Sequence, residues 1–177
     1  MRNAGLLLIV MALLAPAIVL PFTGMQATAA TTLQNQMKRV FPAADSFSTK
    51  QPGPPPHFVA YNGDKTVAGY VFWTTEVEPL ERGYDGPIKM LVGVDTKGIL
   101  TGVLVVEHRE PYGYFSVDVP RFPAQFKNKD IRDPFKLGSD VDAVSGATIT
   151  ITSSSRAIRN GARRIARALM TPTGSTK

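Results

Sequence analysis

Cysteine is absent from this 177-residue sequence, and its absence excludes several kinds of chemistry at once. A chain without thiols forms no disulfide, holds no iron–sulfur cluster through cysteine and has no cysteine nucleophile. Histidine is scarce as well: His57 and His108 are the only two, which is too few for a histidine-rich metal centre. Any redox chemistry of this chain must therefore come from a bound organic cofactor.

Acidic residues are few relative to basic ones, with 14 Asp and Glu against 20 Lys and Arg and a formal net charge of +6. A positive balance is compatible with nucleic acid as a partner, but the basic residues lack the interleaved aromatic residues of nucleic-acid surfaces. We therefore expect no nucleic-acid partner. Solvation alone, anionic lipid or acidic redox proteins account for the charge. No nucleophile–base pair is evident, so nothing in the sequence indicates hydrolysis.

The first 29 residues are typical of an export segment. A short positive opening precedes the apolar run 4–22, and Ala27-Thr28-Ala29 has the small residues of a signal cleavage site. The run is long for a signal peptide and marginal for a membrane span of ~20 residues. Residues 1–29 are thus either a signal peptide or an uncleaved membrane anchor. In both cases the remainder is expected on the periplasmic side of a bacterial inner membrane.

Residues 30–177 are expected to form one domain, with its core from 57 to 170. Apolar residues recur at helical spacing over 32–41, and Pro42 helps to end this predicted helix. The proline-rich segment 51–56 cannot join a sheet, because proline lacks the N–H that a ladder needs, and is interpreted as a surface connector.

Four strands are predicted from runs of β-branched and aromatic residues bounded by turn signals. They are expected at Phe58–Tyr61, Val67–Glu76, Ile88–Asp95 and Ile99–Glu107. Asn62-Gly63 is a hairpin turn signal and Thr96-Lys97-Gly98 a second turn, so the neighbouring strands should pair antiparallel. A short helix is predicted around residues 123–126.

The last predicted element is an amphipathic helix over Ser155–Met170. Ile158, Ile165 and Leu169 share its apolar face and should pack against the core. The opposite face carries five arginines: Arg156, Arg159, Arg163, Arg164 and Arg167. Strands and helices without βαβ alternation indicate an α+β fold, an antiparallel sheet with a C-terminal amphipathic helix.

Small residues and hydroxyls gather in the segment 142–150, just before this helix. Gly146 and Ala147 let a ligand approach the backbone closely, and the entrance of a helix favours an anion such as a phosphate. The alternative is an ordinary turn in which Ser153, Ser154 or Ser155 caps the helix.

The pattern Asp142-x-x-Ser145-Gly146-Ala147-Thr148 resembles the flavinylation motif of the FMN-binding domain family. That family includes the G subunit of the Rnf electron-transport complex and the C subunit of the sodium-translocating NADH:quinone reductase. It also includes the exported domain of the nitrous-oxide-respiration regulator. The resemblance implies FMN as cofactor, joined by a phosphoester to the hydroxyl of Thr148 by a dedicated flavin transferase.

The same resemblance implies roles for the neighbouring residues. Ser145 and Gly146, followed by Ala147, would shape the loop, and Asp142 would be recognised by the transferase. Thr150 is the second candidate for the acceptor. The segments 84–95 and 106–111 resemble the central hairpin of the family. This places the turn Glu107-His108-Arg109-Glu110 near the flavin ring, with Glu107 and His108 as candidate site residues, although a solvated charged turn is an equal reading. Four aromatic residues are candidates for stacking on the ring: Tyr84, Tyr112, Tyr114 and Phe115.

Two functions are compatible with these features. The first is an electron-carrier subunit rather than a stand-alone enzyme, working with redox partner proteins or a quinone-linked membrane complex. The second is a non-redox, membrane-anchored scaffold or assembly module that keeps the fold without covalent flavin.

Overall fold

A computed structural model describes the backbone of residues 23–170 and the side chains from residue 30 onward. The predicted export segment, residues 1–29, falls largely outside this range. Within the described range, no helix is both long and apolar enough to cross a membrane.

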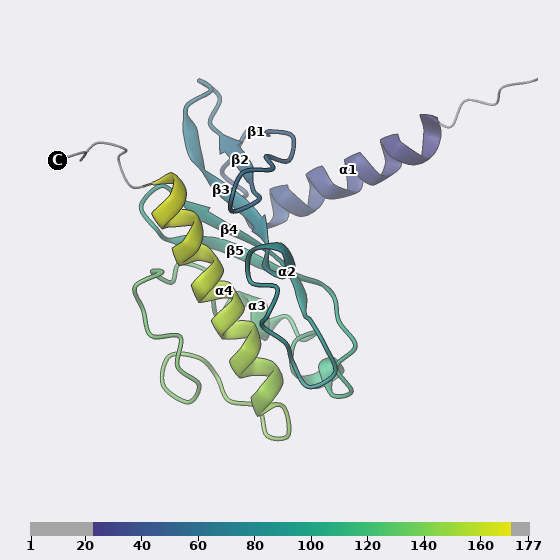
Figure 1. The fold of residues 1–177 in the computed structure, drawn as a ribbon, viewed down its shortest axis with the longest axis vertical. Coiled ribbons are helices and arrows are strands. Elements are labelled where there is room, and N and C mark those ends of the chain that lie inside the picture. Colours follow the sequence, from purple (N-terminus) through teal and green to yellow (C-terminus); the bar gives the residue numbers. More distant parts are fainter. Residues whose placement is uncertain (1–22, 171–177) are drawn as a thin grey trace, which may run out of the picture.

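Five strands form one antiparallel sheet in the order β1-β2-β3-β4-β5, so every strand pairs with its neighbour in sequence. The strands are β1 (Ser46–Phe47), β2 (Phe58–Tyr61), β3 (Val67–Trp73), β4 (Lys89–Asp95) and β5 (Leu100–Glu107). Figure 1 shows α4 (Thr148–Leu169) lying across one face of the sheet, while α1 (Thr23–Val40) projects from the other side. This arrangement confirms the α+β prediction.

The third strand is shorter than predicted, because the chain turns into a single helical turn, α2 (Thr74–Val77). At this point the hydroxyl of Thr74 accepts a hydrogen bond from the Met90 N–H and donates one to the Ile88 carbonyl, both at 3.0 Å. A side chain thus replaces the backbone pairing with the next strand. Strand β1 was not predicted, since two residues carry no readable alternation.

The two faces of the sheet bury separate apolar clusters. On one face, α1 contributes Met37 and Val40, and the end of the helix lies almost on the strands. A Cβ added to Gly93 or Gly102 would stand only 2.7 or 2.8 Å from the Val40 carbonyl oxygen. These glycines are therefore required by close packing. Helix α1 also begins earlier than the predicted helix over 32–41.

Helix α4 starts at Thr148, seven residues before the predicted start at Ser155 (155 − 148). The serine-rich run resembled a loop, but Ser153 to Ser155 are buried in the described structure. Small side chains let the helix approach the core closely, and Ser155 donates its hydroxyl to the Ile151 carbonyl one turn back at 2.7 Å. The earlier start places Thr148 at the helix N-terminus.

The apolar face of α4 packs against the larger cluster through Ile158 and Ile165, with Leu169 at its edge, as predicted. The segment between β5 and α4 is irregular and contains only η1 (Gly113–Phe115) and α3 (Arg121–Ala124). The latter confirms a short helix near residue 123. The Tyr70 hydroxyl donates to the Leu169 carbonyl at 3.3 Å and so ties the C-terminal end of α4 to the sheet.

Candidate functional site

A cavity of about 310 Å³ lies at the N-terminus of α4. Three segments that are distant in sequence meet there, one before β4, one after β5 and the start of the helix. Its walls are formed by Tyr84, Pro111, Tyr112, Gly146, Ala147, Thr148, Ile149 and Thr150. The volume is at the lower end of the range for small-molecule sites.

The loop that leads into α4 needs glycine. Gly146 has φ +81°, a left-handed conformation that glycine adopts without steric cost, and open space surrounds the position of its absent Cβ. The next residue, Ala147, is the buried N-cap of α4; its N–H donates to the Val144 carbonyl at 3.1 Å. Its own carbonyl accepts the first helical hydrogen bond, from Ile151 at 2.9 Å.

No side chain of the described residues caps the N-terminus of α4. The backbone N–H groups of the first turn have no acceptor within a helix, and the helix dipole adds partial positive charge there. Residues of this first turn line the cavity, and the N-terminus of a helix is a favourable place for an anion. The alternative that Ser153, Ser154 or Ser155 caps the helix is wrong, because all three lie inside it.

The two candidate acceptor threonines differ in their surroundings. Thr148 is exposed and lines the cavity. Thr150 is only 4% exposed, and its hydroxyl donates to the carboxylate of Glu110. The hydroxyl of Thr148 is thus accessible, while that of Thr150 is engaged inside the protein.

Glu110 lies in the turn that was predicted near the ring, but no role was predicted for its side chain; its carboxylate joins two walls of the cavity. Besides the Thr150 hydroxyl, it accepts the backbone N–H groups of Tyr84 and Asp85, each at 3.0 Å. An acidic residue followed by proline just after an apolar strand is the sequence feature that marks it. Two residues of the cavity wall, Pro111 and Ile149, were not singled out as site residues; Ile149 is 57% exposed.

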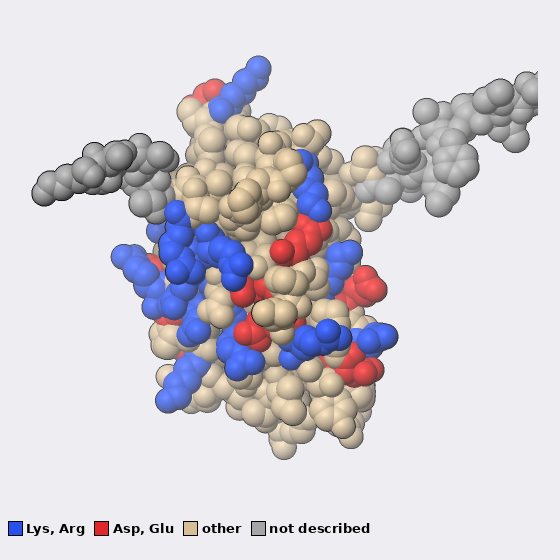
Figure 2. All heavy atoms as spheres, viewed as in Figure 1, with Lys and Arg blue, Asp and Glu red and all other residues tan. Residues whose placement is uncertain are grey.

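Exposed aromatic rings surround the cavity. Tyr84 is 72% exposed and Tyr112 52% exposed, and both line the cavity; Tyr114 beside them is 70% exposed. The ring of Phe115 contacts those of Tyr112 and Tyr114, with centroids 5.4 and 4.9 Å apart. Figure 2 shows that this end of the molecule, at the bottom of the view, carries few charged side chains. Such a surface suits a planar, largely apolar ring.

Six of the predicted residues do not line this cavity: Tyr114, Phe115, Glu107, His108, Asp142 and Ser145. Glu107 is exposed at the end of β5, 4.0 Å from the Lys89 ammonium. His108 directly follows β5, and its Nε2 lies 2.7 Å from a carboxylate oxygen of Asp118. Asp142 forms an ion pair with Arg121 at 2.8 Å and lines a second cavity of about 300 Å³. Ser145 is exposed in the loop that leads into α4.

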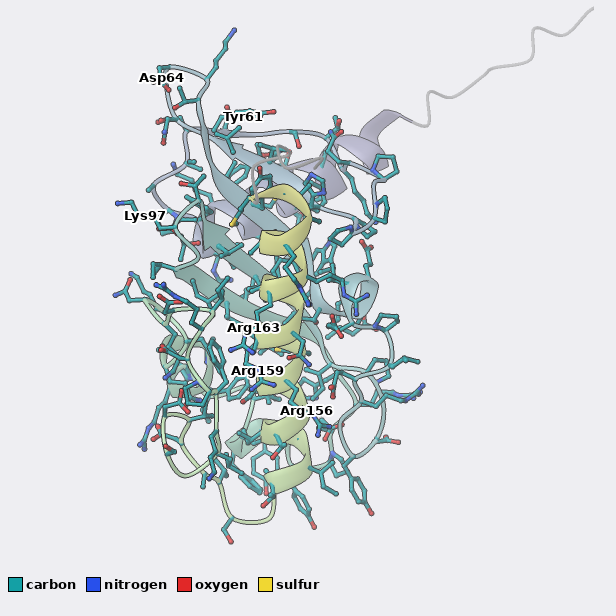
Figure 3. The ribbon with its side chains drawn as sticks, turned by 60° about the vertical axis from the view of Figure 1, so that its left-hand side comes forward. Tyr61, Asp64, Lys97, Arg156, Arg159 and Arg163 are labelled. Atoms are coloured by element: carbon teal, nitrogen blue, oxygen red, sulfur yellow. The ribbon has the colours of Figure 1, made fainter. Side chains whose placement is uncertain are left out.

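The arginines of α4 form a separate surface along the helix, and Figure 3 shows Arg156, Arg159 and Arg163 in succession there. Arg163 donates to the carbonyls of Ile131, Arg132 and Asp133, and so fastens that loop to α4. Burial lowers the pKa of the Arg163 guanidinium, and the like charges of Arg159 and Arg167 lower it further. In the described residues, no group of acidic, histidine or cysteine side chains is placed to hold a metal ion.

The fold and the site define a class of protein: an α+β domain with a cavity at an uncapped helix N-terminus, bordered by aromatic rings. Residues 83–166, which include every residue that lines the cavity, match the model of the FMN-binding domain.

Curated relatives match the chain more widely. It is 30% identical over 160 residues to the G subunit of the ion-translocating oxidoreductase complex of Methanosarcina acetivorans, covering 81% of this chain and 82% of that protein. It is 34% identical over 113 residues to the G subunit of the same name from Haemophilus influenzae, covering 58% of this chain and 51% of that one. The match thus spans about half the length of the Haemophilus protein. The chain belongs to the FMN-binding domain family.

A solved structure, the crystal structure of NqrC from Shewanella oneidensis, is similar with a TM-score of 0.42 and 24% identity. The similarity covers 67% of this chain and 65% of that one.

Proposed function

We propose that this chain is an exported electron-transfer protein that carries FMN, joined by a phosphoester to the Oγ of Thr148. One observation carries the assignment: the Thr148 hydroxyl is exposed in a cavity at an uncapped helix N-terminus. The competing hydroxyl, that of Thr150, is buried and already donates to Glu110. Family membership supports FMN as the ligand.

The attachment is a group transfer for which FAD is the donor. The bond between Thr148 Oγ and the flavin-side phosphorus forms while the pyrophosphate bond of FAD breaks. AMP leaves, and the hydroxyl proton is transferred with it, so that atoms and charge balance. A flavin transferase is the partner that this step requires. The phosphodiester formed keeps one negative charge, which the first-turn N–H groups of α4 stabilise.

Once bound, FMN supplies the capacity to accept and release electrons at its ring. The residues of this chain determine where the ring lies and what it meets. Tyr84 and Tyr112 flank the cavity and offer aromatic faces for stacking. Because Gly146 and Ala147 have little or no side chain, the phosphate can approach the backbone. Ser145 and Asp142 are exposed in the loop, where a transferase can reach them.

We propose that the partners are redox proteins or a quinone-linked membrane complex, on the periplasmic side of the inner membrane. The names of the relatives support this, since those proteins are subunits of ion-translocating oxidoreductase complexes. Residues 1–29 would serve as signal peptide or anchor. Glu107 and His108, at the end of β5, remain candidates for the route by which electrons reach the ring.

The test is expression of the full chain together with a flavin transferase. We expect yellow colour that survives denaturation and acid precipitation. We also expect an intact mass increased by one FMN less one water, and a flavin peptide that maps to Thr148. A colourless chain of unmodified mass despite an active transferase would instead favour the scaffold or assembly module without covalent flavin. Flavin mapped to Thr150 would overturn the choice of acceptor.

A further inference from the structure

Glu110 is a buried carboxylate at the junction of the three segments that form the cavity. It is 7% exposed, and among the described residues its side-chain partners are backbone N–H groups and a hydroxyl rather than lysines or arginines. Two of them are the backbone N–H groups of Tyr84 and Asp85, and the third is the Thr150 hydroxyl. One side chain thereby ties the loop that contains Tyr84 and Asp85, here called the Tyr84 loop, to the first turn of α4.

The backbone of Glu110 is itself held in place by His108, which precedes it, and by Asp118, which follows it. Its backbone N–H donates to Nδ1 of His108 at 3.1 Å, so Nδ1 is the unprotonated ring nitrogen. The other ring nitrogen, Nε2, then carries the hydrogen and donates to Asp118 at 2.7 Å. The chain from Asp118 through His108 fixes the position from which the Glu110 side chain starts.

Two glycines leave the space that this arrangement needs. A Cβ on Gly83 would lie 2.4 Å from Oε1 of Glu110, and a Cβ on Gly113 would lie 2.1 Å from the ring of His108. Neither glycine has a positive φ, so close packing rather than backbone conformation requires them. The absence of side chains at both positions is what lets the carboxylate and the imidazole fill this site.

We propose that Glu110 is a positioning residue for the attachment of flavin at Thr148, acting through Thr150. Thr148 and Thr150 belong to the same helical turn, so Glu110, by holding the Thr150 side chain, holds the first turn of backbone from which the Thr148 side chain starts. The Tyr84 loop, which forms the facing wall, is held by the same carboxylate. This inference rests on the proposed function, because it concerns the geometry of that same acceptor.

Two substitutions remove this connection in different ways. Glu110→Gln places an amide NH₂ group among partners that are themselves donors, so at least one of the three hydrogen bonds is lost. Thr150→Val keeps the volume of the side chain and removes only the hydroxyl. Thr150→Ser restores the hydroxyl and should rescue the loss. Glu76→Gln is the matched control, because Glu76 is an exposed carboxylate that pairs with Lys50 at 2.6 Å and lies near the C-terminal end of α4.

The experiment measures the rate at which purified full-length chain gains FMN from FAD in the presence of a flavin transferase, followed by intact mass. Misplacement of a reacting group by about 1 Å can cost on the order of a hundredfold in rate. We expect Glu110→Gln and Thr150→Val to lower kcat for attachment roughly ten- to a hundredfold, with KM for the chain little changed. Thr150→Ser and Glu76→Gln should react at the wild-type rate, and flavin should map to Thr148 throughout.

Each result decides between the two claims. Attachment to Glu110→Gln and Thr150→Val at the wild-type rate would overturn the positioning role and leave the proposed function intact. So would a loss in Thr150→Val that Thr150→Ser does not rescue, or a loss that matches the unfolded fraction seen by circular dichroism. Failure of the wild-type chain to gain flavin would contradict the proposed function itself.

Discussion

At the scale of single residues, the proposed covalent attachment of FMN depends on the hydroxyl of Thr148. Valine has nearly the same volume and lacks only the acceptor oxygen. Since Thr148 is exposed and donates no hydrogen bond to the described residues, we expect Thr148→Val to lose covalent flavin completely. Its melting temperature should remain that of the unmodified wild-type chain. Thr148→Ser keeps the acceptor and is the control.

Gly146 is the residue whose backbone conformation decides the shape of the loop. At φ +81° an alanine is strained, and we expect Gly146→Ala to lower the free energy of unfolding by about 1 kcal/mol. Gly146→Asn should cost less, because asparagine tolerates the left-handed region better. Denaturation with urea measures both changes. Because no atom lies within 4 Å of the added Cβ, a larger loss in the alanine variant than in the asparagine variant tests strain rather than crowding.

At the scale of elements, the loop before the motif depends on Asp140. Its carboxylate accepts the backbone N–H groups of Phe135 at 3.0 Å and Lys136 at 2.5 Å, with Lys129 3.3 Å away. Burial raises the pKa of Asp140, but these hydrogen bonds and the lysine charge outweigh it, so the pKa lies below the usual 3.8. The folded state thus binds the proton less tightly than the unfolded state.

The lowered pKa of Asp140 makes the stability of the folded state depend on pH. The contribution of Asp140 is fully present above pH 3.8 and is lost as the pH falls below that value. We expect Asp140→Asn to melt at a lower temperature than the wild type at pH 7, by an amount that corresponds to about 1 kcal/mol. The difference should shrink as the pH approaches 3. Calorimetry over this range checks it, and a difference that is constant with pH would contradict the assignment.

The bounds of some elements were predicted from the sequence more accurately than those of others. Strand β2 was placed without error, and β4 and β5 within one residue, because β-branched residues and turn signals bound them. The start of α4 was missed because Ser and Thr favour loops until tertiary packing buries them. The motif itself was readable, whereas the link from Glu110 to Thr150 joins positions 40 residues apart and has no local pattern.

For the molecule as a whole, the central question is on which side of the membrane it works. The positive opening, the apolar run 4–22 and the small residues at 27–29 predict export, and the relatives are subunits of ion-translocating complexes. A domain on the periplasmic side that lost its FMN would have no cytoplasmic pool from which to replace it. The proposed covalent link through Thr148 would remove that risk, so the two proposals, export and covalent attachment, are consistent with each other.

We therefore expect alkaline phosphatase fused after Lys177 to be active, because that enzyme folds only where disulfides form. A matched fusion without residues 2–22 should be inactive although made in equal amount, since it lacks the apolar run. The same two fusions should also differ in their content of covalent FMN. If the transferase acts on the periplasmic side, the full-length fusion should carry covalent FMN and the fusion without residues 2–22 should not. An inactive full-length fusion that is stably made would place the domain in the cytoplasm and contradict export. Covalent flavin in that inactive fusion would show that attachment does not depend on export.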